Sequence, residues 1–504
     1  MDSPAAHSCA ADLWPPEAIE AIRAASLELL ERVGVQVDSS RAQELLVAAG
    51  CTPGPQGRVL MPAVVVAAAL AACPKEYTVV ARDPAFDVVM NAAPGDIRVH
   101  NMGEAPDVAD PRSGEARRAT FRDQVLATRV MHHCRYPDSI NSLVTPSDVP
   151  GELHPLYSYL AIAAETDKLI GGPGLDFPWQ ARYLAGMAEA VAEARPGERP
   201  GDACAIEMGF SPVSPLHLGP RVCEGIIEAV GLGMAVQVLT NPVAGTTAPA
   251  SLAGALAQQD AEILAGVVLV QSVAPGSPCS YGARLSVADP RSGQLLCGAG
   301  QWALASVGAT LLARRHGLAC DCYGPDTSAR TLDLQLGYQY AVPTLTGALA
   351  RPRFMSGIGA WGDTTTTCLE LLAIGDAVYR VVLDALEPPE WGADALDVDA
   401  MIEGITGAMG YLGTRHTRRW LRRITPSEGL SSRGGFAEWV AGGRKDAVDL
   451  AQERVAEALA RGPVGLPDDV EAELCRLIGE AAAQLGLSGH PDPRRLLDEA
   501  RAPA

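Results

Sequence analysis

Two carboxylate side chains, those of Glu207 and Asp321, interrupt short apolar runs in which an ionised group is unusual. Glu207 lies in the run Ala203–Gly209, and Asp321 lies in the run Ala319–Gly324. Side chains alternate between the two faces of a strand, so each carboxylate falls on the face opposite to the cysteines of its run. Burying a carboxylate costs free energy unless the group has a partner or a function. We therefore predict that Glu207 and Asp321 point into a catalytic site.

The alternative for these groups is a polar layer inside the protein whose members satisfy one another. The same alternation directs Gln237 inward from the run Ala235–Thr240, where Val236 and Val238 face the other way. For Gln237 the sequence leaves both interpretations open, a substrate-binding side chain or a member of such a layer.

Aromatic residues make up only 5% of the chain, so the few that fall at or just beyond strand ends carry more weight. These residues are Phe210, Tyr281, Trp302, Tyr323 and Trp361. The face of an aromatic ring attracts a quaternary ammonium by cation–π interaction. Tyr281, Tyr323 and Trp361 are thus predicted to wall a pocket for such a cation, with ordinary loop packing as the alternative.

The chain has twelve cysteines, and four of them, Cys204, Cys279, Cys320 and Cys322, belong to the same apolar runs. Thiolates converging from neighbouring strands could bind zinc. The strand alternation points three of the four toward helices instead, and no CxxC pair has zinc-ribbon spacing. We expect no tightly bound metal.

The segment Tyr411–Arg423 is the only basic cluster in a chain of net charge −20. It contains Arg415 and His416. A solvated helix face is the default interpretation of such a cluster. The functional alternative is a docking surface for an acidic partner or for a phosphate-bearing cofactor.

Strand-like and helix-like patterns alternate through the middle of the chain. The expected strands are Ile97–Asn101, Ser139–Val144, Leu169–Gly172, Ala203–Gly209, Ala235–Thr240, Pro278–Ala283, Ala319–Gly324 and Arg353–Ile358. The expected helices are Thr120–His132, Pro155–Glu165, Gln180–Ala194, Pro220–Gly231, Ala250–Val268, Gln301–His316, Thr331–Leu349 and Thr367–Leu386.

Eight strand–helix units are the number that closes an α/β barrel, so we predict a (β/α)8 TIM barrel whose site lies at the carboxyl ends of its strands. A doubly wound open sheet is the alternative, but no GxGxxG motif follows the first strand and no GxxxxGK[ST] motif occurs. We expect a helical and hairpin cap over residues 1–92, the barrel over 93–390, and a helical extension over 391–504 that packs on the barrel.

The net charge of −20 argues against a nucleic-acid partner. The start of the chain lacks the basic and apolar regions of a signal peptide, and apolar runs such as Val64–Cys73 are too short to span a bilayer. We expect a cytoplasmic homo-oligomer that acts on a small molecule, with neither nucleic acid nor membrane as its partner.

Several short motifs occur in order along nearly the whole chain. They are Leu27–Val35, Pro74–Pro84, Ser214-Pro215-Leu216, Pro242–Pro249, Asp333–Tyr338 and Tyr411–Thr417. Each is weak by itself, but the ordered set is specific, and it resembles the trimethylamine methyltransferase (MttB-like) family of corrinoid-dependent methyltransferases.

This resemblance implies a TIM barrel that moves a methyl group from an amine to the cobalt of a corrinoid carried by a separate protein. The founding members carry pyrrolysine near the segment that resembles Gly324–Arg330, and no such residue occurs here. The chain is therefore similar to relatives without pyrrolysine, which demethylate quaternary amines such as glycine betaine.

On this resemblance, Glu207 and Asp321 would offset the ammonium charge of the substrate. Arg284 or Arg330 would bind a betaine carboxylate through two parallel hydrogen bonds. Asn101 begins the loop that stands where the family has a glycine-rich loop, and we expect it at the substrate.

The resemblance also places Gly324, Arg415 and His416 toward the corrinoid and its carrier protein. The chain departs from the family pattern at Asp326–Arg330 and Gly413–Thr417, which leaves the identity of the methyl donor open. The alternatives are a non-catalytic barrel that binds a small molecule or docks a corrinoid protein, and a zinc-dependent methyltransferase.

Overall fold

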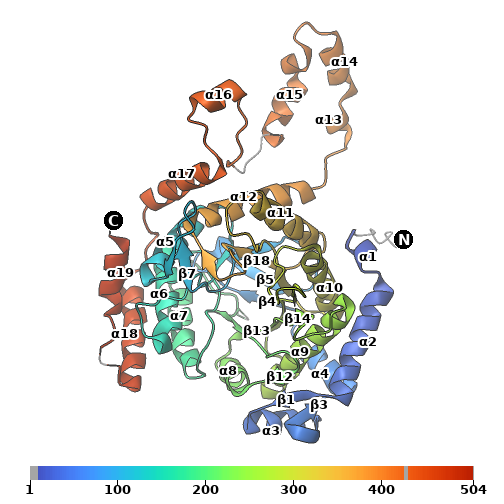
Figure 1. Ribbon diagram of the computed structural model, residues 1–504, viewed down its shortest axis with the longest axis vertical. Coiled ribbons are helices and arrows are strands. Elements are labelled where there is room, and N and C mark those ends of the chain that lie inside the picture. The colour runs from blue at the N-terminus through green and yellow to red at the C-terminus, as the bar shows by residue number, and fades with distance from the viewer. Residues whose placement is uncertain (1–8, 202, 425–428, 488, 503–504) are drawn as a thin grey trace.

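A ring of eight parallel strands, each followed by a helix, forms the centre of the computed structural model (Figure 1), which describes residues 9–201, 203–424, 429–487 and 489–502. The strands are β6 (Arg98–Asn101), β9 (Ser139–Ile140), β10 (Leu169–Ile170), β11 (Glu207–Phe210), β13 (Ala235–Thr240), β15 (Cys279–Ala283), β17 (Cys320–Tyr323) and β18 (Phe354–Ile358). The helices are α5 (Phe121–His133), α6 (His154–Glu165), α7 (Gln180–Glu193), α8 (Pro220–Gly231), α9 (Leu252–Val273), α10 (Gly300–His316), α11 (Leu334–Ala348) and α12 (Leu369–Leu386). The predicted (β/α)8 barrel is confirmed.

The ring closes on itself, which excludes the doubly wound alternative. The last strand, β18, pairs with the first, β6, with Phe354 opposite Arg98. The strands β10 and β11 end the ladder, and the backbone N–H of Gly172 joins them by donating to the carbonyl oxygen of Glu207 at 3.2 Å. A Cβ on Gly172 would lie 2.4 Å from Met208 Sδ and 2.5 Å from that carbonyl oxygen. A glycine is therefore required where the ring closes.

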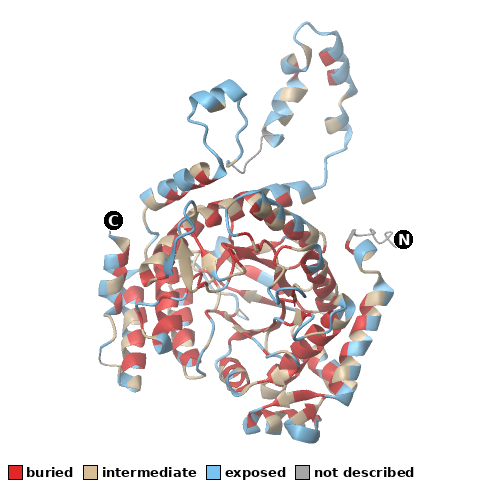
Figure 2. Ribbon diagram, in the orientation of Figure 1, coloured by how far each residue is buried: buried red, intermediate tan, exposed pale blue. Residues whose placement is uncertain are grey.

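The outward faces of the strands pack against the helices and form the main core (Figure 2). Val238 of β13 rests on Gly266 of α9, where an added Cβ would come within 2.5 Å of the valine side chain. The helix α9 is long and apolar enough to cross a membrane, but 89% of its apolar window is buried inside the protein. α9 is therefore a core helix of the barrel.

A hairpin of β4 (Glu76–Val79) and β5 (Val88–Asn91) covers the amino ends of the barrel strands. The Val80 N–H donates to the Cys204 carbonyl oxygen at 3.0 Å, and the Cys204 N–H donates to the carbonyl oxygen of Thr78 at 2.8 Å. Apolar side chains of the hairpin form a second core cluster with Leu169, Cys204, Ala235, Ala319 and Phe354 of the barrel. The barrel is thus closed at this end, and its opening lies at the carboxyl ends of the strands.

The remaining N-terminal elements brace one side of the barrel. They are α1 (Cys9–Leu13), α2 (Pro16–Arg32), β1 (Val35–Val37), α3 (Ser40–Ala48), β2 (Thr52–Pro53), β3 (Arg58–Leu60) and α4 (Ala63–Ala72). The helices α2, α3 and α4 all contact α9. The strand β1 pairs with β12 (His217–Leu218), which lies in the loop after β11.

The C-terminal extension has two parts that differ in packing. The helices α17 (Ala447–Ala460), α18 (Asp468–Leu485) and α19 (Pro493–Arg501) pack on barrel helices, and Arg501 reaches Glu165 of α6 at 2.9 Å. The other helices instead project from the barrel and are exposed (Figures 1 and 2). The helices α13 (Ala393–Leu396), α14 (Val398–Thr406) and α15 (Arg415–Trp420) form one projection, called the arm, and α16 (Phe436–Ala441) lies in a second.

The expectation that all of residues 391–504 pack on the barrel is wrong for this arm. Residues 400–420 also do not form one continuous helix, because α14 ends at Thr406 and Gly410 has a φ of 57°, a left-handed conformation that favours glycine.

We predict that Gly172→Ala lowers the free energy of unfolding by about 1–3 kcal/mol, because the new methyl group would overpack the point where the ring closes. Gly174→Ala is the matched control, since a Cβ there would meet nothing within 4 Å. Urea unfolding followed by circular dichroism measures both. Equal stability of the two variants would contradict the role given to Gly172.

Candidate active site

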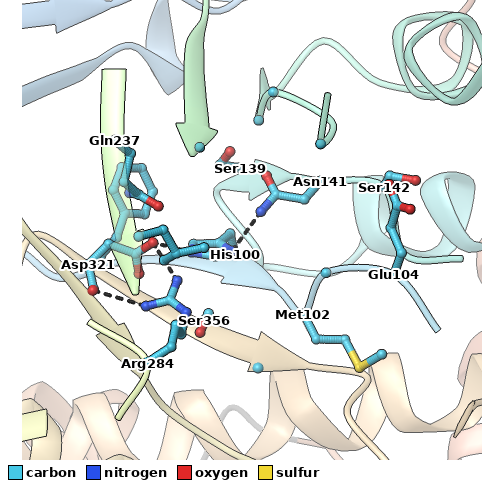
Figure 3. A pocket seen from close by; sticks show the side chains of 18 of the residues that line it. His100, Met102, Glu104, Ser139, Asn141, Ser142, Gln237, Arg284, Asp321 and Ser356 are labelled. Carbon is cyan, nitrogen blue, oxygen red and sulfur yellow. Dashed lines mark hydrogen bonds and ion pairs between the residues drawn. The ribbon is translucent and has the colours of Figure 1, made fainter. Parts of the chain in front are cut away.

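A cavity of about 500 Å³ opens among the carboxyl ends of the barrel strands (Figure 3). Its volume suits a small organic ligand. Its polar and charged lining residues are His100, Glu104, Ser139, Asn141, Ser142, Glu207, Ser211, Gln237, Asn241, Arg284, Asp321, Tyr323, Asp326, Ser356 and Thr364. They come from most of the barrel units, so only the closed ring brings them to one place.

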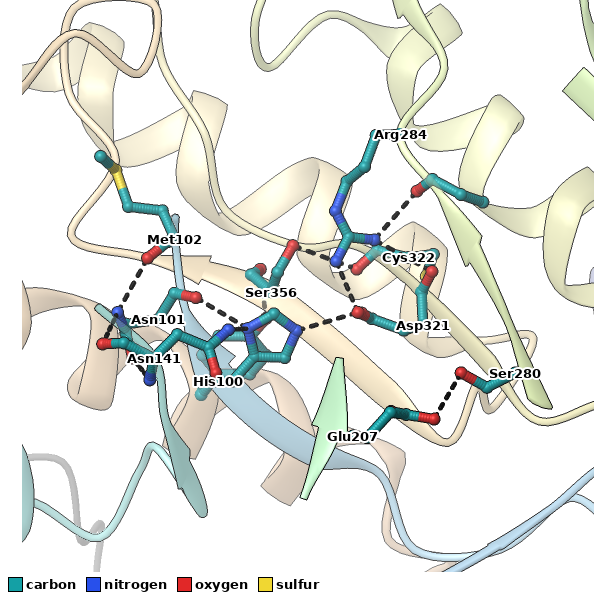
Figure 4. A network of polar contacts seen from close by, with 12 residues as sticks. His100, Asn101, Met102, Asn141, Glu207, Ser280, Arg284, Asp321, Cys322 and Ser356 are labelled. Carbon is teal, nitrogen blue, oxygen red and sulfur yellow. Dashed lines mark hydrogen bonds and ion pairs between the residues drawn. The ribbon is translucent and has the colours of Figure 1, made fainter. Parts of the chain in front are cut away.

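An ion pair between Asp321 and Arg284 lies in this lining (Figure 4). Arg284 Nη2 lies 2.6 Å from Asp321 Oδ2, and Arg284 Nη1 donates to the backbone carbonyl oxygen of Asp321 at 2.9 Å. His100 Nε2 lies 3.1 Å from the same Oδ2. Burial opposes ionisation of Asp321, but Arg284 and His100 outweigh it and hold the pKa of this carboxyl well below its usual range. The carboxylate is therefore charged, and the arginine already balances that charge.

Glu207 lies deeper, next to the hairpin under the barrel. Its Oε1 accepts hydrogen bonds from the Tyr77 hydroxyl at 2.6 Å and from the Ser280 hydroxyl at 2.8 Å. Burial raises the pKa of Glu207, and these two hydrogen bonds offset only part of the increase. Glu207 is thus positioned by neutral hydroxyls, without an ion pair among its described contacts.

Two further carboxyls, Glu104 after β6 and Asp326 after β17, lie in loops at the mouth. Burial raises the pKa of Glu104 to about 7 and that of Asp326 to about 7. His154 Nε2 lies 3.2 Å from Glu104 Oε2, but burial lowers the pKa of His154 to about 4, so the imidazole offers no positive charge at neutral pH. Apart from the neighbouring Cys297 thiol, Asp326 Oδ2 is buried without a hydrogen-bond partner. Both carboxyls lack a compensating cation.

Five of the predicted site residues reach the cavity. Glu207, Gln237, Arg284, Asp321 and Tyr323 all line it. The strand alternation therefore oriented the two carboxylates and Gln237 correctly. The Tyr323 ring is already occupied, because Trp302 stacks on it at 4.3 Å between centroids and Arg284 Cζ lies 5.2 Å from its centroid.

The predicted aromatic wall is wrong for Tyr281 and Trp361. Tyr281 faces the helices, where its hydroxyl donates to Asp260 of α9 at 3.0 Å and its ring stacks on His316 of α10. Trp361 is buried in a separate cluster with residues such as Tyr340 and Leu371. Within the described lining, Phe354 and Tyr323 are the phenyl-type rings, so aromatic faces do not surround the cavity.

Asn101 and Gly324 have structural positions that exclude them from the cavity lining. Asn101 Nδ2 donates to the Asn141 carbonyl oxygen at 3.0 Å, and its Oδ1 accepts from the Asn141 N–H at 2.8 Å, so Asn101 links the ends of β6 and β9. A Cβ on Gly324 would lie 2.0 Å from the Tyr379 hydroxyl. The close packing of β17 against α12 therefore requires a glycine at position 324.

The remaining predicted residues lie outside the cavity. Arg330 is exposed and pairs with Asp363 at 2.7 Å. Arg415 is exposed on α15 of the arm, and His416 Nε2 lies 3.2 Å from the Ala395 carbonyl oxygen of α13. These positions correct the assignment of Arg330 to the substrate and give no support for Arg415 and His416 at the mouth.

Sequence reasoning missed His100, Glu104, Asn141 and Asp326. Alternation along Ile97–Asn101 places His100 and Asn101 on opposite faces, so one of the two must face inward, and the structure shows that it is His100. The others lie beyond strand ends, where side-chain direction has no simple period.

The structure does not support a zinc-dependent methyltransferase. In the described part of the chain, no three His, Cys, Asp or Glu residues lie close enough together to bind a metal ion. Cys322 faces α10, with the Thr310 hydroxyl 3.9 Å from its sulfur.

Comparison with known proteins gives relatives along the whole length. The family model described as Trimethylamine methyltransferase (MTTB) matches residues 3–486. Trimethylamine methyltransferase MttB of Methanosarcina thermophila is 27% identical over 459 residues, covering 89% of this chain and 92% of that protein. Glycine betaine methyltransferase of Desulfitobacterium hafniense strain Y51 is 25% identical over 482 residues, covering 93% and 96%. The crystal structure of the Methanosarcina barkeri monomethylamine methyltransferase MtmB aligns over 94% of each chain, with a TM-score of 0.43 and 11% identity.

We predict that the free energy of unfolding of the ligand-free protein falls as pH rises between 3.8, the ordinary pKa of an aspartic acid, and about 7, because folded Asp326 holds its proton more tightly than the unfolded chain does. The contribution of Asp326 is at most about 1.4 kcal/mol per pH unit. Urea unfolding across this window should show a shallower decline for Asp326→Asn. Parallel curves for the two proteins would contradict the raised pKa.

Proposed function

The chain belongs to the trimethylamine methyltransferase (MTTB) family, and on that basis we propose that it transfers a methyl group from a quaternary amine to the cobalt of a corrinoid carried by a partner protein. The relatives include one named for trimethylamine and one named for glycine betaine. When a quaternary ammonium loses a methyl group, the leaving group is a neutral tertiary amine. No proton has to be delivered to it. The absence of pyrrolysine from the sequence is consistent with that simpler requirement.

The observation that carries this proposal is the charge of the cavity. Glu104, Glu207 and Asp326 line it without a compensating cation, and burial raises the pKa of each. A quaternary ammonium has no N–H to donate, so it is stabilised by nearby negative charge and not by directed hydrogen bonds. Its entry would favour ionisation of these carboxyls, which in turn would hold the cation.

The residues of the chain would bind and orient the amine and exclude water from it. Glu207 keeps its proposed role as a charge partner at the base of the cavity. Asp321 is less suited to that role, because Arg284 already balances its charge at 2.6 Å. The pair Asp321–Arg284, together with His100, instead forms a hydrogen-bonded polar wall of the cavity.

A corrinoid supplies a strongly nucleophilic cobalt that accepts the methyl group. A cavity of about 500 Å³ accommodates a small amine, so the corrin ring would approach at the mouth, where the Glu104 and Asp326 loops lie.

We propose the arm as the surface that meets the carrier protein. Two of its arginines are already engaged within the arm, Arg419 with Asp394 and Arg423 with Glu390, so exposed Arg415 and Arg418 are the cations we assign to that contact.

We predict that the protein methylates free cobalamin reduced to Co(I) when a quaternary amine is supplied, which the change in the cobalamin absorption spectrum measures. Glu207→Gln should raise KM for the amine about tenfold, equivalent to about 1.4 kcal/mol, because a neutral amide keeps the hydroxyl contacts but removes the charge. Glu262→Gln is the control, since Glu262 is a buried carboxyl outside the cavity. Absence of methylated cobalamin with every quaternary amine tested would overturn the proposal.

A further inference from the structure

We infer that the methyl donor carries a net positive charge, as a quaternary ammonium with an uncharged polar tail, and is not a zwitterionic betaine; this inference rests on the proposed methyl transfer. It comes from the balance of charges around the cavity. Four carboxyls line the cavity, Glu104, Glu207, Asp321 and Asp326, whereas Arg284 is the one Lys or Arg in the described lining. Arg284 pairs with Asp321, which His100 also contacts at 3.1 Å, and the other three carboxyls have no Lys or Arg partner in the described lining.

Among the described lining residues, Arg284 and His100 both already contact the Asp321 carboxylate. Both terminal nitrogens of Arg284 are engaged with Asp321, one at the carboxylate and one at the backbone carbonyl oxygen. His100 uses Nε2 on the same carboxylate, and its Nδ1 lies 2.7 Å from the Asn101 carbonyl oxygen. Arg330, the other arginine expected to bind a carboxylate, is exposed outside the cavity. A betaine carboxylate would therefore meet a guanidinium whose charge the Asp321 carboxylate already balances.

The three uncompensated carboxyls come from different units of the barrel. Glu207 lies at the base, where it is tied to Tyr77 of the hairpin under the barrel. Glu104 follows β6 and Asp326 follows β17, and β18 separates these two strands in the ring. In a glycine-betaine-like molecule the carboxylate lies one carbon from the ammonium. The ammonium would favour ionisation of these carboxyls, and the attached carboxylate would then lie among like charges, which is unfavourable in a poorly solvated cavity.

Neutral polar side chains are available for the rest of the ligand. Ser142, Ser211, Gln237 and Asn241 line the same cavity and offer hydroxyl and amide groups. Such groups suit a hydroxyl or amide tail and carry no charge to balance a carboxylate. The buried Oδ2 of Asp326, with the Cys297 thiol as its one neighbouring hydrogen-bonding group, is an acceptor that a cation in the cavity would stabilise.

The test is isothermal titration calorimetry of the full chain with choline and glycine betaine at about pH 7.5, where partly protonated carboxyls would release protons as a cation binds. We expect choline to bind roughly tenfold or more tightly than glycine betaine. Its binding heat should depend on the ionisation enthalpy of the buffer, because protons are released. Asp326→Asn and Glu104→Gln should each weaken choline binding by roughly tenfold and reduce the proton release, whereas Glu262→Gln should change neither.

Choline that does not bind, or that binds no more tightly than glycine betaine, would overturn the inference. Cobalamin methylation with both compounds then separates the two proposals. Methylation from glycine betaine but not from choline would refute the net-cation donor and leave methyl transfer standing. Tight choline binding without methylation from any quaternary amine would refute methyl transfer, and would reduce the inference to a cation-binding site.

Discussion

Closure of the strand ring is the constraint on which every other feature of the site depends. Glu104, Glu207, Arg284 and Asp326 are separated by long stretches of sequence, and they meet because β18 returns to pair with β6. The ring is completed where Gly172 approaches the backbone of Glu207 at 3.2 Å. Glu207 thus contributes its backbone to the closure of the ring and its carboxyl to the cavity. One residue therefore takes part both in the fold and in the charge of the site.

The cavity combines one neutralised ion pair with three carboxyls that have no counter-charge. In water such carboxyls would be ionised and solvated, but here burial raises their pKa and leaves them ready to be stabilised by a cation. This arrangement differs from an aromatic cage, in which ring faces supply the attraction. Under the proposed function, formal charge takes the place of ring faces, since aromatic residues such as Tyr281 and Trp361 are used for packing.

The sequence was sufficient to predict the barrel because each strand is an apolar run bounded by glycine, proline or polar residues, and all eight runs became strands. Alternation also oriented Glu207 and Asp321, since both lie within regular strands. Alternation excludes Tyr281 only once the structure shows that its neighbour Ser280 faces inward to Glu207. Positions in loops, such as Asp326 and Trp361, could not be oriented, because their direction is set by contacts with residues far away in the sequence. The projection of the arm from the barrel could not be predicted either, since an amphipathic helix pattern does not say whether the surface that covers it belongs to the same chain.

The hairpin beneath the barrel has a consequence for the sequence of binding events. Because β4 and β5 cover the amino ends of the strands, the proposed amine and methyl acceptor would share the opening at the carboxyl ends. Under the proposed reaction the order is compulsory. The amine enters before the corrinoid protein covers the mouth, and the demethylated product remains enclosed until that protein departs. Steady-state kinetics would then follow an ordered ternary-complex scheme, in which excess carrier protein traps the enzyme without its donor and slows turnover.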